Sequence, residues 1–339
     1  MSICPIEKLI QFDLLDDCIH TPAGYYHFYR YYPPNTDIMT EEEKKAEIEQ
    51  MTQLFDTLAR EIAIFATDKI EDMSEIKRFY KNLAPEYDHL TSDIIAAIES
   101  TESRNSAAVQ RAFYFIIRTD KQEESVYNQI AGKGYHINKA QREELAVLLR
   151  NYYLREFISA EIYTLEKELK QDVKLRKKIE KKPELFQKEL QRRLLPHSME
   201  FFPSFAVQNG TYRSTMMLKN FPFEIGSCCL LQTACMRGTS FMMRLTPMNG
   251  REIKKLTEKQ MNKSSYKRSS TQATDQLEGL SEQTALAEFY QAVSNSQTTL
   301  FFVSVYIECY GRNEEDLQST IRAVEEKLII VERIDSYPA

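Results

Sequence analysis

Two kinds of hydrophobic spacing alternate along this chain. Short runs rich in β-branched and aromatic residues predict strands, at 25–32, 61–68, 112–119, 211–219, 240–246 and 300–309. Between these runs, apolar residues recur every three to four positions, which is the spacing of one buried helix face. The pattern predicts strands that alternate with helices, without the long parallel series of a doubly wound sheet.

The predicted helices begin at capping residues. Thr40 precedes one helix, and Glu43 three positions later completes a capping box. Asn313 precedes the last helix, and its predicted buried stripe consists of Leu317, Ile321, Val324 and Leu328. The other helices are predicted at 74–99 with a break at Pro85, at 122–133, from Asn138 and Gln141 past Phe157 toward Leu169, at 225–236, from Asn249, and at 281–293.

These elements predict an α+β fold, an α/β sandwich of two ferredoxin-like lobes whose small, mainly antiparallel sheets are covered by helices. We assign residues 1–165 to the first lobe, 166–200 to a charged helical connection and 201–339 to the second lobe. Residues 263–274 are rich in Ser, Thr and Lys and show no apolar period, so we expect a mobile loop near 262–280.

Two segments bear on nucleic-acid binding. Residues 166–193 carry eleven Lys or Arg against six acids, which fits a contact with DNA or lipid phosphates, but interleaved charges favour a solvent-exposed helical pair. The aromatic run 25–32 resembles a platform for stacked bases, although we prefer a half-buried strand with aromatic residues on both faces. The net charge of -6 argues against a general electrostatic grip on nucleic acid.

Composition and motifs predict no catalytic, metal or cofactor site. The five His are scattered and the six Cys form no CxxC pair. Asp13, Asp16 and Asp17 fit an Asx-rich turn better than a carboxylate metal site. The Gly132-Lys133 pair lacks the Ser or Thr that must follow it in a phosphate-binding loop, so we expect no binding or hydrolysis of ATP.

Cysteine usage and hydropathy bear on localisation. Cys228, Cys229 and Cys235 fall in the predicted apolar helix at 225–236, so we expect buried thiols and a reducing compartment. The N-terminus does not have the pattern of a signal peptide. The apolar run at 299–310 is shorter than the ~20 residues of a membrane helix. We expect a cytoplasmic protein that reaches a membrane through a partner.

The second half of the chain resembles a known family. Its strand-to-Pro opening at 211–222, its strand at 240–247 and its polar, acidic helix start at 311–317 are similar to the N-terminal domain of conjugative-transfer ATPases. These are the TraC/TraE-type proteins of type IV secretion, relatives of the fourth VirB protein. The resemblance covers roughly residues 20–335. In that family a RecA-like motor domain with Walker A and B motifs follows, and this sequence contains neither motif.

The resemblance implies an assembly and docking domain of an ATPase, with no catalytic residue carried over. The implied partners are sister subunits of a homo-oligomer and inner-membrane proteins of the secretion channel, which would place the domain at the cytoplasmic periphery of the inner membrane. We expect the contact surface around 228–243 and 301–306. Three alternatives stay open: a stand-alone adaptor or structural protein, a module that contacts single-stranded DNA through 166–193, and an unrecognised enzyme.

Overall fold

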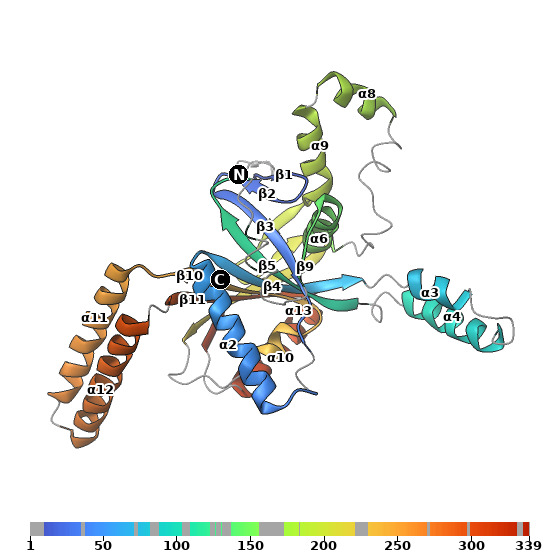
Figure 1. Cartoon of the computed structure of the whole chain (residues 1–339). Helices are drawn as coiled ribbons and strands as arrows, with labels where there is room; N and C mark the ends of the chain where they lie inside the picture. Colours follow the sequence, from blue (N-terminus) through green and yellow to red (C-terminus); the bar gives the residue numbers. More distant parts are fainter. Residues whose placement is uncertain are drawn as a thin grey trace.

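The computed structural model describes most of the chain (Figure 1). The described residues are 10–34, 38–70, 74–81, 88–103, 109–122, 126, 130, 137–155, 173–182, 184–220, 230–269, 272–296, 299–330 and 335–338. They form one continuous antiparallel sheet with helices on both faces. The chain therefore has the α+β fold that the hydrophobic spacing predicts.

All six predicted strands are present, with ends shifted by at most three residues. The strands are β1 (Asp13–Leu14), β2 (Ile19–Thr21), β3 (Gly24–Tyr31), β4 (Ile62–Ile70), β5 (Val109–Thr119), β6 (Ile137–Lys139), β7 (Met199–Phe201), β8 (Ala206–Gln208), β9 (Thr211–Asn220), β10 (Thr239–Pro247), β11 (Phe301–Gly311) and β12 (Asp335–Pro338). Their order is β1-β2-β3-β5-β4-β10-β11-β9-β8-β7, with β6 paired to β3 and β12 paired to β9.

The helices begin largely as their capping residues predict. They are α2 (Glu41–Leu58), α3 (Ser74–Lys81), α4 (Asp88–Ser103), α6 (Arg142–Leu154), α8 (Val173–Lys181), α9 (Glu184–Leu194), α10 (Leu231–Ala234), α11 (Gly250–Arg268), α12 (Ala273–Ser296) and α13 (Glu314–Ile330). Thr40 and Asn249 each form a complete capping box, and the Asn313 side chain accepts from the Asp316 backbone N–H at 2.8 Å. Among the helices that the structure describes, none has the length and apolar character needed to cross a bilayer.

The first half of the chain forms a split β-α-β unit of the ferredoxin type. In chain order it contains β3, α2, β4, the hairpin α3–α4, β5 and β6. In space the strands lie in the order β6-β3-β5-β4, all antiparallel. Val126 and Ile130, which lie between β5 and β6 in the chain, pack in the same core as Leu54 and Leu58 of α2. The strand order is that of the β-α-β-β-α-β arrangement, with a helical hairpin inserted between the second and third strands, and the connection from β5 to β6 lies mostly outside the described residues.

The second half repeats this arrangement. In chain order it contains β9, α10, β10, the hairpin α11–α12, β11, α13 and β12. In space the strands lie in the order β12-β9-β11-β10, again antiparallel. Leu317, Val324 and Leu328 of α13 are buried against the sheet, with Ile321 partly buried beside them, as the predicted stripe requires. Both predicted ferredoxin-like units are thus present, and each carries a helical hairpin at the same point of its topology.

The two repeats join edge to edge through β4 and β10. Five residue pairs form this seam, with Ile64 opposite Met243 at its centre. Because the pairing is antiparallel and each edge strand is the second strand of its repeat, an approximate two-fold axis normal to the sheet relates the two halves. The predicted small sheets are therefore fused into one. The fusion also pairs two edges that would otherwise expose free backbone hydrogen-bonding groups.

Helices cover the two faces of the sheet unequally (Figure 1). One face is covered by α2, α10 and α13 across both repeats, over a core that includes Phe115, Ile117, Phe241, Val305 and Ile307. The opposite face is covered over the first repeat by α6 and α9. There Leu145 and Leu148 of α6 and Leu190 and Leu194 of α9 lie in one core with Tyr114 and Ile116 of β5.

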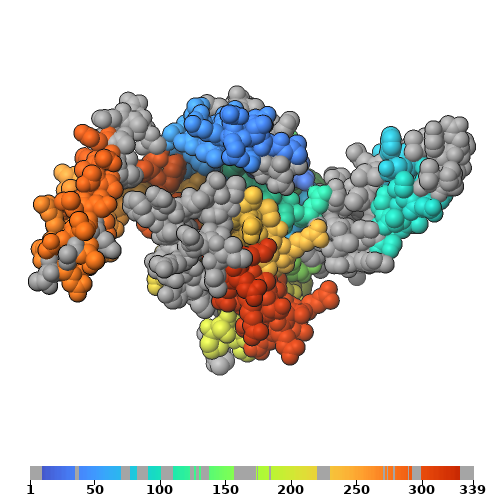
Figure 2. Space-filling view, turned by 90° about the horizontal axis from the view of Figure 1, so that it is seen from below, coloured from blue at the N-terminus to red at the C-terminus, as the bar shows by residue number. Residues whose placement is uncertain are grey.

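The helical hairpins stand away from the body on opposite sides (Figures 1 and 2). The hairpin α3–α4 connects β4 to β5, and the hairpin α11–α12 connects β10 to β11. Since β4 and β10 run in opposite directions, their following hairpins leave the sheet at opposite ends. We call α11–α12 the C-terminal arm.

The prediction of a mobile loop near 262–280 is wrong. Helix α11 continues to Arg268 and α12 begins at Ala273, so most of this segment is helical. The two helices pack closely on each other although the sequence has no apolar period here. A Cβ on Gly279 would lie 2.8 Å from the backbone O of Ser264, so small residues let the two helices approach closely. The hydroxyls of Ser264 and Ser265 bond to carbonyls one turn earlier, which satisfies polar groups within α11.

Two helix predictions also need correction. Helix α6 begins after Gln141, because Asn138 belongs to β6, and it ends at Leu154 instead of continuing past Phe157. Arg155 caps it in the left-handed conformation, with φ of 53°. Of the apolar helix predicted at 225–236, residues 225–229 lie outside the described residues, and α10 spans Leu231–Ala234 of the remainder. Pro85, most of 122–133 and all of 156–172 lie outside the described residues.

Candidate functional site

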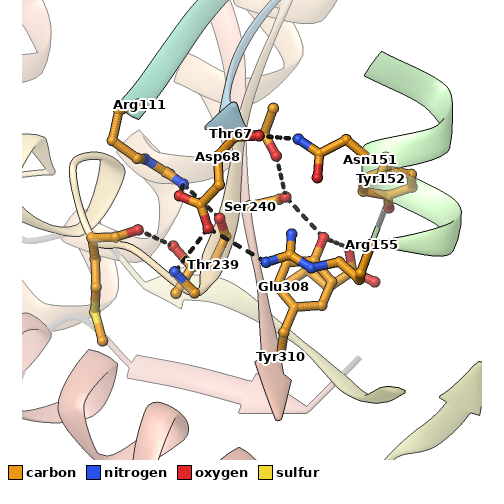
Figure 3. A network of polar contacts seen from close by, with 12 residues as sticks. Thr67, Asp68, Arg111, Asn151, Tyr152, Arg155, Thr239, Ser240, Glu308 and Tyr310 are labelled. Atoms are coloured by element: carbon orange, nitrogen blue, oxygen red, sulfur yellow. Dashed lines mark hydrogen bonds and ion pairs between the residues drawn. The ribbon is translucent and has the colours of Figure 1, made fainter. Parts of the chain in front are cut away.

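The strongest polar feature is a buried ion pair beside the seam between the repeats (Figure 3). Asp68 of β4 lies opposite Arg111 of β5, and its Oδ1 accepts from Arg111 Nη1 at 2.8 Å. The two side chains are 3% and 8% exposed. The guanidinium also donates to the backbone O of Ala234 and of Thr239, and the Gly238 N–H donates to Asp68 Oδ2 at 2.9 Å. The pair therefore ties the first repeat to the loop that precedes β10.

The C-terminal end of α6 approaches Asp68 from the opposite face of the sheet. The Asn151 side chain donates to the backbone O of Asp68, and Arg155 Nη2 lies 3.4 Å from Asp68 Oδ2. The Arg155 guanidinium lies 4.0 Å from the centre of the Tyr310 ring, in a cation–π contact. The chain thus turns at Arg155, and the Arg155 side chain contacts Asp68 of the first repeat and Tyr310 of the second.

A second polar chain runs across the seam. Thr67 Oγ1 lies 3.0 Å from Ser240 Oγ, which lies 2.8 Å from the Tyr310 hydroxyl. That hydroxyl donates to Glu308 Oε2 at 2.6 Å. Glu308 Oε1 in turn lies 3.4 Å from Arg213 Nη1, and Arg213 donates to the last carbonyls of α6. Both chains of contacts therefore link β4, the second repeat and the end of α6. We call the whole set the seam network.

Electrostatics favour a structural role for the seam network. Burial lowers the pKa of Arg111, and the Asp68 carboxylate opposes that shift. Burial raises the pKa of Tyr310 well above its ordinary value, and Glu308 adds to this effect, so the phenol stays protonated and donates. Within the network each Asp, Glu and Arg has a partner of opposite charge. These charge pairs fasten the two repeats together.

An apolar hollow of about 440 Å³ lies between α6 and the sheet. Its lining includes Phe65 of β4, Ile116 of β5 and Tyr152 of α6. Arg244 Nη2 and Glu61 Oε1, which lie 2.7 Å apart, provide its ionised groups. The hollow is suited to an apolar group, and its ionised groups are already paired with each other.

The structure also brings together Asp17, Cys18 and His27, whose ligand atoms lie within 4.8 Å of one another. Residue spacing gave no sign of this group, because His27 comes from the neighbouring strand. Burial raises the pKa of Cys18 to about 12, while metal binding requires the thiolate. Burial also pushes the pKa of Asp17 upward, but Lys139 and His27 outweigh it and hold that pKa below its ordinary value. The Lys139 ammonium thus takes the carboxylate that a metal would need.

The three N-terminal acids do not converge on one site. Asp13 lies 3.4 Å from His20, Asp16 lies 2.7 Å from Arg142, and Asp17 binds Lys139. Each carboxylate therefore has its own partner, which fits the predicted turn better than a carboxylate metal site.

The remaining candidates from the sequence lie apart from one another. His20 stacks on Tyr25, and His197 is exposed near β7. His136, the Gly132-Lys133 pair, Cys228 and Cys229 lie outside the described residues, and nothing is described of the His89 side chain. Cys235 is exposed, so the expectation of a buried thiol is wrong there, because α10 ends just before it. Cys18 and Cys309 are buried thiols.

The two segments weighed for nucleic-acid binding take different forms. The aromatic run 25–32 is mostly β3, an interior strand between β2 and β5, and Tyr29 is fully buried. The burial of His27, Phe28 and Tyr29 fits the half-buried strand and removes these three side chains from contact with bases. The described part of 166–193 forms α8 and α9, the helical pair that the charges predict. Helix α9 buries Leu190 and Leu194, while Lys177 and Lys178 of α8 are exposed.

Among the described residues, exposed large apolar side chains are most numerous on the two helices of the C-terminal arm. They are Leu256, Met261, Tyr266, Leu277, Leu280 and Tyr290. Tyr266 is 79% exposed and Leu277 is 69% exposed. Helices α11 and α12 pack on each other through Ser264 and Gly279, so these large side chains remain on the outside. Exposed apolar side chains gathered on one projecting element are typical of a protein-interaction surface.

No protein-family model matches the sequence, and no curated protein matches it either.

Proposed function

We propose that this chain is an assembly and docking domain of a type IV secretion ATPase. In this role it binds sister subunits and the inner-membrane proteins of the channel, and it carries no motor chemistry of its own. The proposal joins the resemblance of 211–317 to the conjugative-transfer ATPases with one structural observation. That observation is the C-terminal arm, a projecting helical hairpin with large apolar side chains in solvent.

The arm has the physical properties of a docking element. Burying an exposed Leu or Met side chain in an interface contributes about 1.5–3 kcal/mol, so the apolar side chains of the arm can together contribute much of the free energy of a contact. The close packing at Gly279 holds the helices in one arrangement before binding, which reduces the entropy that association costs. The arm also stands clear of the sheet, so a partner can reach both of its helices (Figure 2).

The arm is tested by co-purification from cells that express the chain with the membrane-platform proteins of its own operon. We expect the platform proteins to be retained by the wild-type chain and lost from a Tyr266→Ser/Leu277→Ser variant. Both residues are exposed, so the variant should keep its fold, which far-UV circular dichroism checks. Lys263→Ser on the same arm is the matched control and should retain the partners. Equal retention by the double variant would remove the arm from the proposal.

A DNA-contacting function is the second candidate, and the exposed lysines of α8 favour it. Helix α8 carries five Lys or Arg against one Glu. A titration of fluorescent single-stranded DNA at physiological salt decides between the two functions. Salt-sensitive binding that a Lys177→Glu/Lys178→Glu variant abolishes, without any co-purifying platform protein, would establish the DNA function in place of docking.

A further inference from the structure

The two repeats differ in what covers the sheet face that carries α6. In the first repeat α6 lies across β5 and β4. Tyr114 of β5 donates its hydroxyl to Glu144 of α6 at 3.2 Å, and Phe65 of β4 makes an edge contact with Tyr152 of α6 at 6.0 Å between ring centres. Helix α6 therefore packs directly on this face of the first repeat.

The approximate two-fold axis identifies the equivalent face of the second repeat. Ile64 and Met243 are opposite each other at the centre of the seam. On the outer side of this pair, Phe115 lies beside Ile64, and Val305 lies beside Met243. The axis thus relates Phe115 to Val305. Counting along β5 and β11 from that pair, Ala112, Tyr114 and Ile116 correspond to Phe302, Ser304 and Tyr306.

The equivalent face is open at the end nearest the C-terminal arm. Ala112 is 3% exposed, whereas Phe302 at the corresponding position is 61% exposed. A hollow of about 590 Å³ lies over this face, between β10, β11 and the base of α11. Phe302, Met248 and Leu256 form its apolar lining. Leu256 is also exposed, so a large apolar side chain faces solvent from each wall. We call this hollow the β11 groove.

The charge in the β11 groove is positive. Lys255 and Lys259, one turn apart on α11, line it and are exposed. Arg244 also lines it but is paired with Glu61. The Glu252 carboxylate accepts from the Asn249 backbone N–H at 2.9 Å in the capping box, so it is held at the helix start. Two lysines therefore flank an apolar floor.

We propose that the β11 groove binds an acidic amphipathic helix of a partner protein. The helix would lie where α6 lies on the first repeat, with its apolar stripe on Phe302 and Leu256 and its Glu or Asp residues beside Lys255 and Lys259. Helix α6 has 13 residues, so an occupant of about the same length, roughly 20 Å, matches the span of the face. Apolar anchors at i, i+3, i+4 and i+7 with acidic flanks are the recognition pattern that follows.

This inference deepens the docking function but uses a surface separate from the arm side chains Tyr266 and Leu277. Its test can therefore fail while the arm continues to bind its partners, and the reverse also holds.

The experiment selects peptides with the purified chain. A displayed library of amphipathic helices of about 18 residues has fixed Leu along one stripe and random residues along both flanks. We expect enrichment of peptides with Glu and Asp on the flanks. A selected peptide, labelled and measured by fluorescence anisotropy, should bind about tenfold more weakly to Lys255→Glu/Lys259→Glu, and more weakly still to Phe302→Asp. All three residues are exposed, so circular dichroism should show an unchanged fold.

Lys263→Glu, which alters the same helix beyond the groove, is the matched control and should bind like the wild type. Failure to enrich any peptide, enrichment without acidic flanks, or equal binding by Phe302→Asp would each overturn the proposal. Sedimentation of the chain alone provides one more outcome. A dimer that Phe302→Asp converts to a monomer would assign the groove to a second copy of this chain instead.

Discussion

Replacing Asp68 by Asn should destabilise the whole body of the protein. The substitution keeps the shape of the side chain and an oxygen that can accept from the Gly238 N–H. It removes the negative charge that faces Arg111 and Arg155, whose side chains are 8% and 14% exposed. The Arg111 guanidinium would then face a neutral side chain in a site with little access to water, and Arg155 would lose one of its contacts.

The magnitude follows from the burial of the pair. Removing one partner of a buried ion pair costs about 3–5 kcal/mol, because the remaining charge is left in a poorly solvated site. Arg111→Met should cost a similar amount, since the carbonyls of Ala234 and Thr239 would also lose their donor. In the Asp68→Asn/Arg111→Met double variant the Arg111 charge is absent as well, so only Arg155 still faces the neutral side chain at position 68. Its loss should be smaller than the sum of the single losses by about 0.5–3 kcal/mol.

Equilibrium urea unfolding provides the measurement. Far-UV circular dichroism is the suitable signal, because the chain contains no Trp. Asp120→Asn is the matched control. Asp120 pairs with Arg118 at 3.7 Å and is 90% exposed, so its loss should change the free energy of unfolding little. A free energy of unfolding for Asp68→Asn that lies within about 1 kcal/mol of the wild type would refute the reasoning that the seam network fastens the repeats.

Three further outcomes follow from local structure. Burial raises the pKa of the Cys309 thiol from 9.0 to about 12. Its contribution to stability is full below pH 9 and falls by about 1 kcal/mol per pH unit from pH 9 to 12, so Cys309→Ala should flatten that slope in urea unfolding at pH 8 and 10. Gly279→Val should loosen the C-terminal arm, because its Cβ would lie 2.7 Å from the Arg268 backbone N, and faster proteolysis of 250–296 with an unchanged core would show it. Thr40→Ala should cost about 1 kcal/mol by removing the cap on the Glu43 N–H, Thr40→Ser should restore it, and equal unfolding midpoints for all three proteins would contradict this.

Local patterns in the sequence were sufficient for the strands and most helix starts. The β-branched and aromatic run at 300–309 predicts β11, whose Val305 and Ile307 are fully buried. The capping boxes at Thr40 and Asn249 set helix starts that the structure confirms. These features depend on residues within a few positions of one another, so a single sequence contains the information needed to place them.

Contacts between distant residues were not predictable in this way. Asp68 and Arg111 lie 43 positions apart, and each reads as an ordinary polar residue near a strand end. The Ser, Thr and Lys residues at 263–274 suggested a loop, because close helix packing at Ser264 and Gly279 needs little apolar surface and leaves no apolar period in the sequence. The grouping of Asp17, Cys18 and His27 depends on strand pairing in the same way.

The internal repeat is not apparent in the sequence, because equivalent positions match on only one face of the sheet. Phe115 and Val305 occupy equivalent buried positions, and both remain apolar, as a shared core requires. On the opposite face the equivalents diverge from Tyr114 to Ser304 and from Ala112 to Phe302. Tyr114 and Ser304 differ because α6 covers Tyr114 in the first repeat and its Glu144 accepts a hydrogen bond from the Tyr114 hydroxyl. The second pair places a large aromatic ring in solvent at the cost of solubility. Together with Met248 and Leu256, this ring forms an exposed apolar surface in the β11 groove, which the proposed partner helix would bury.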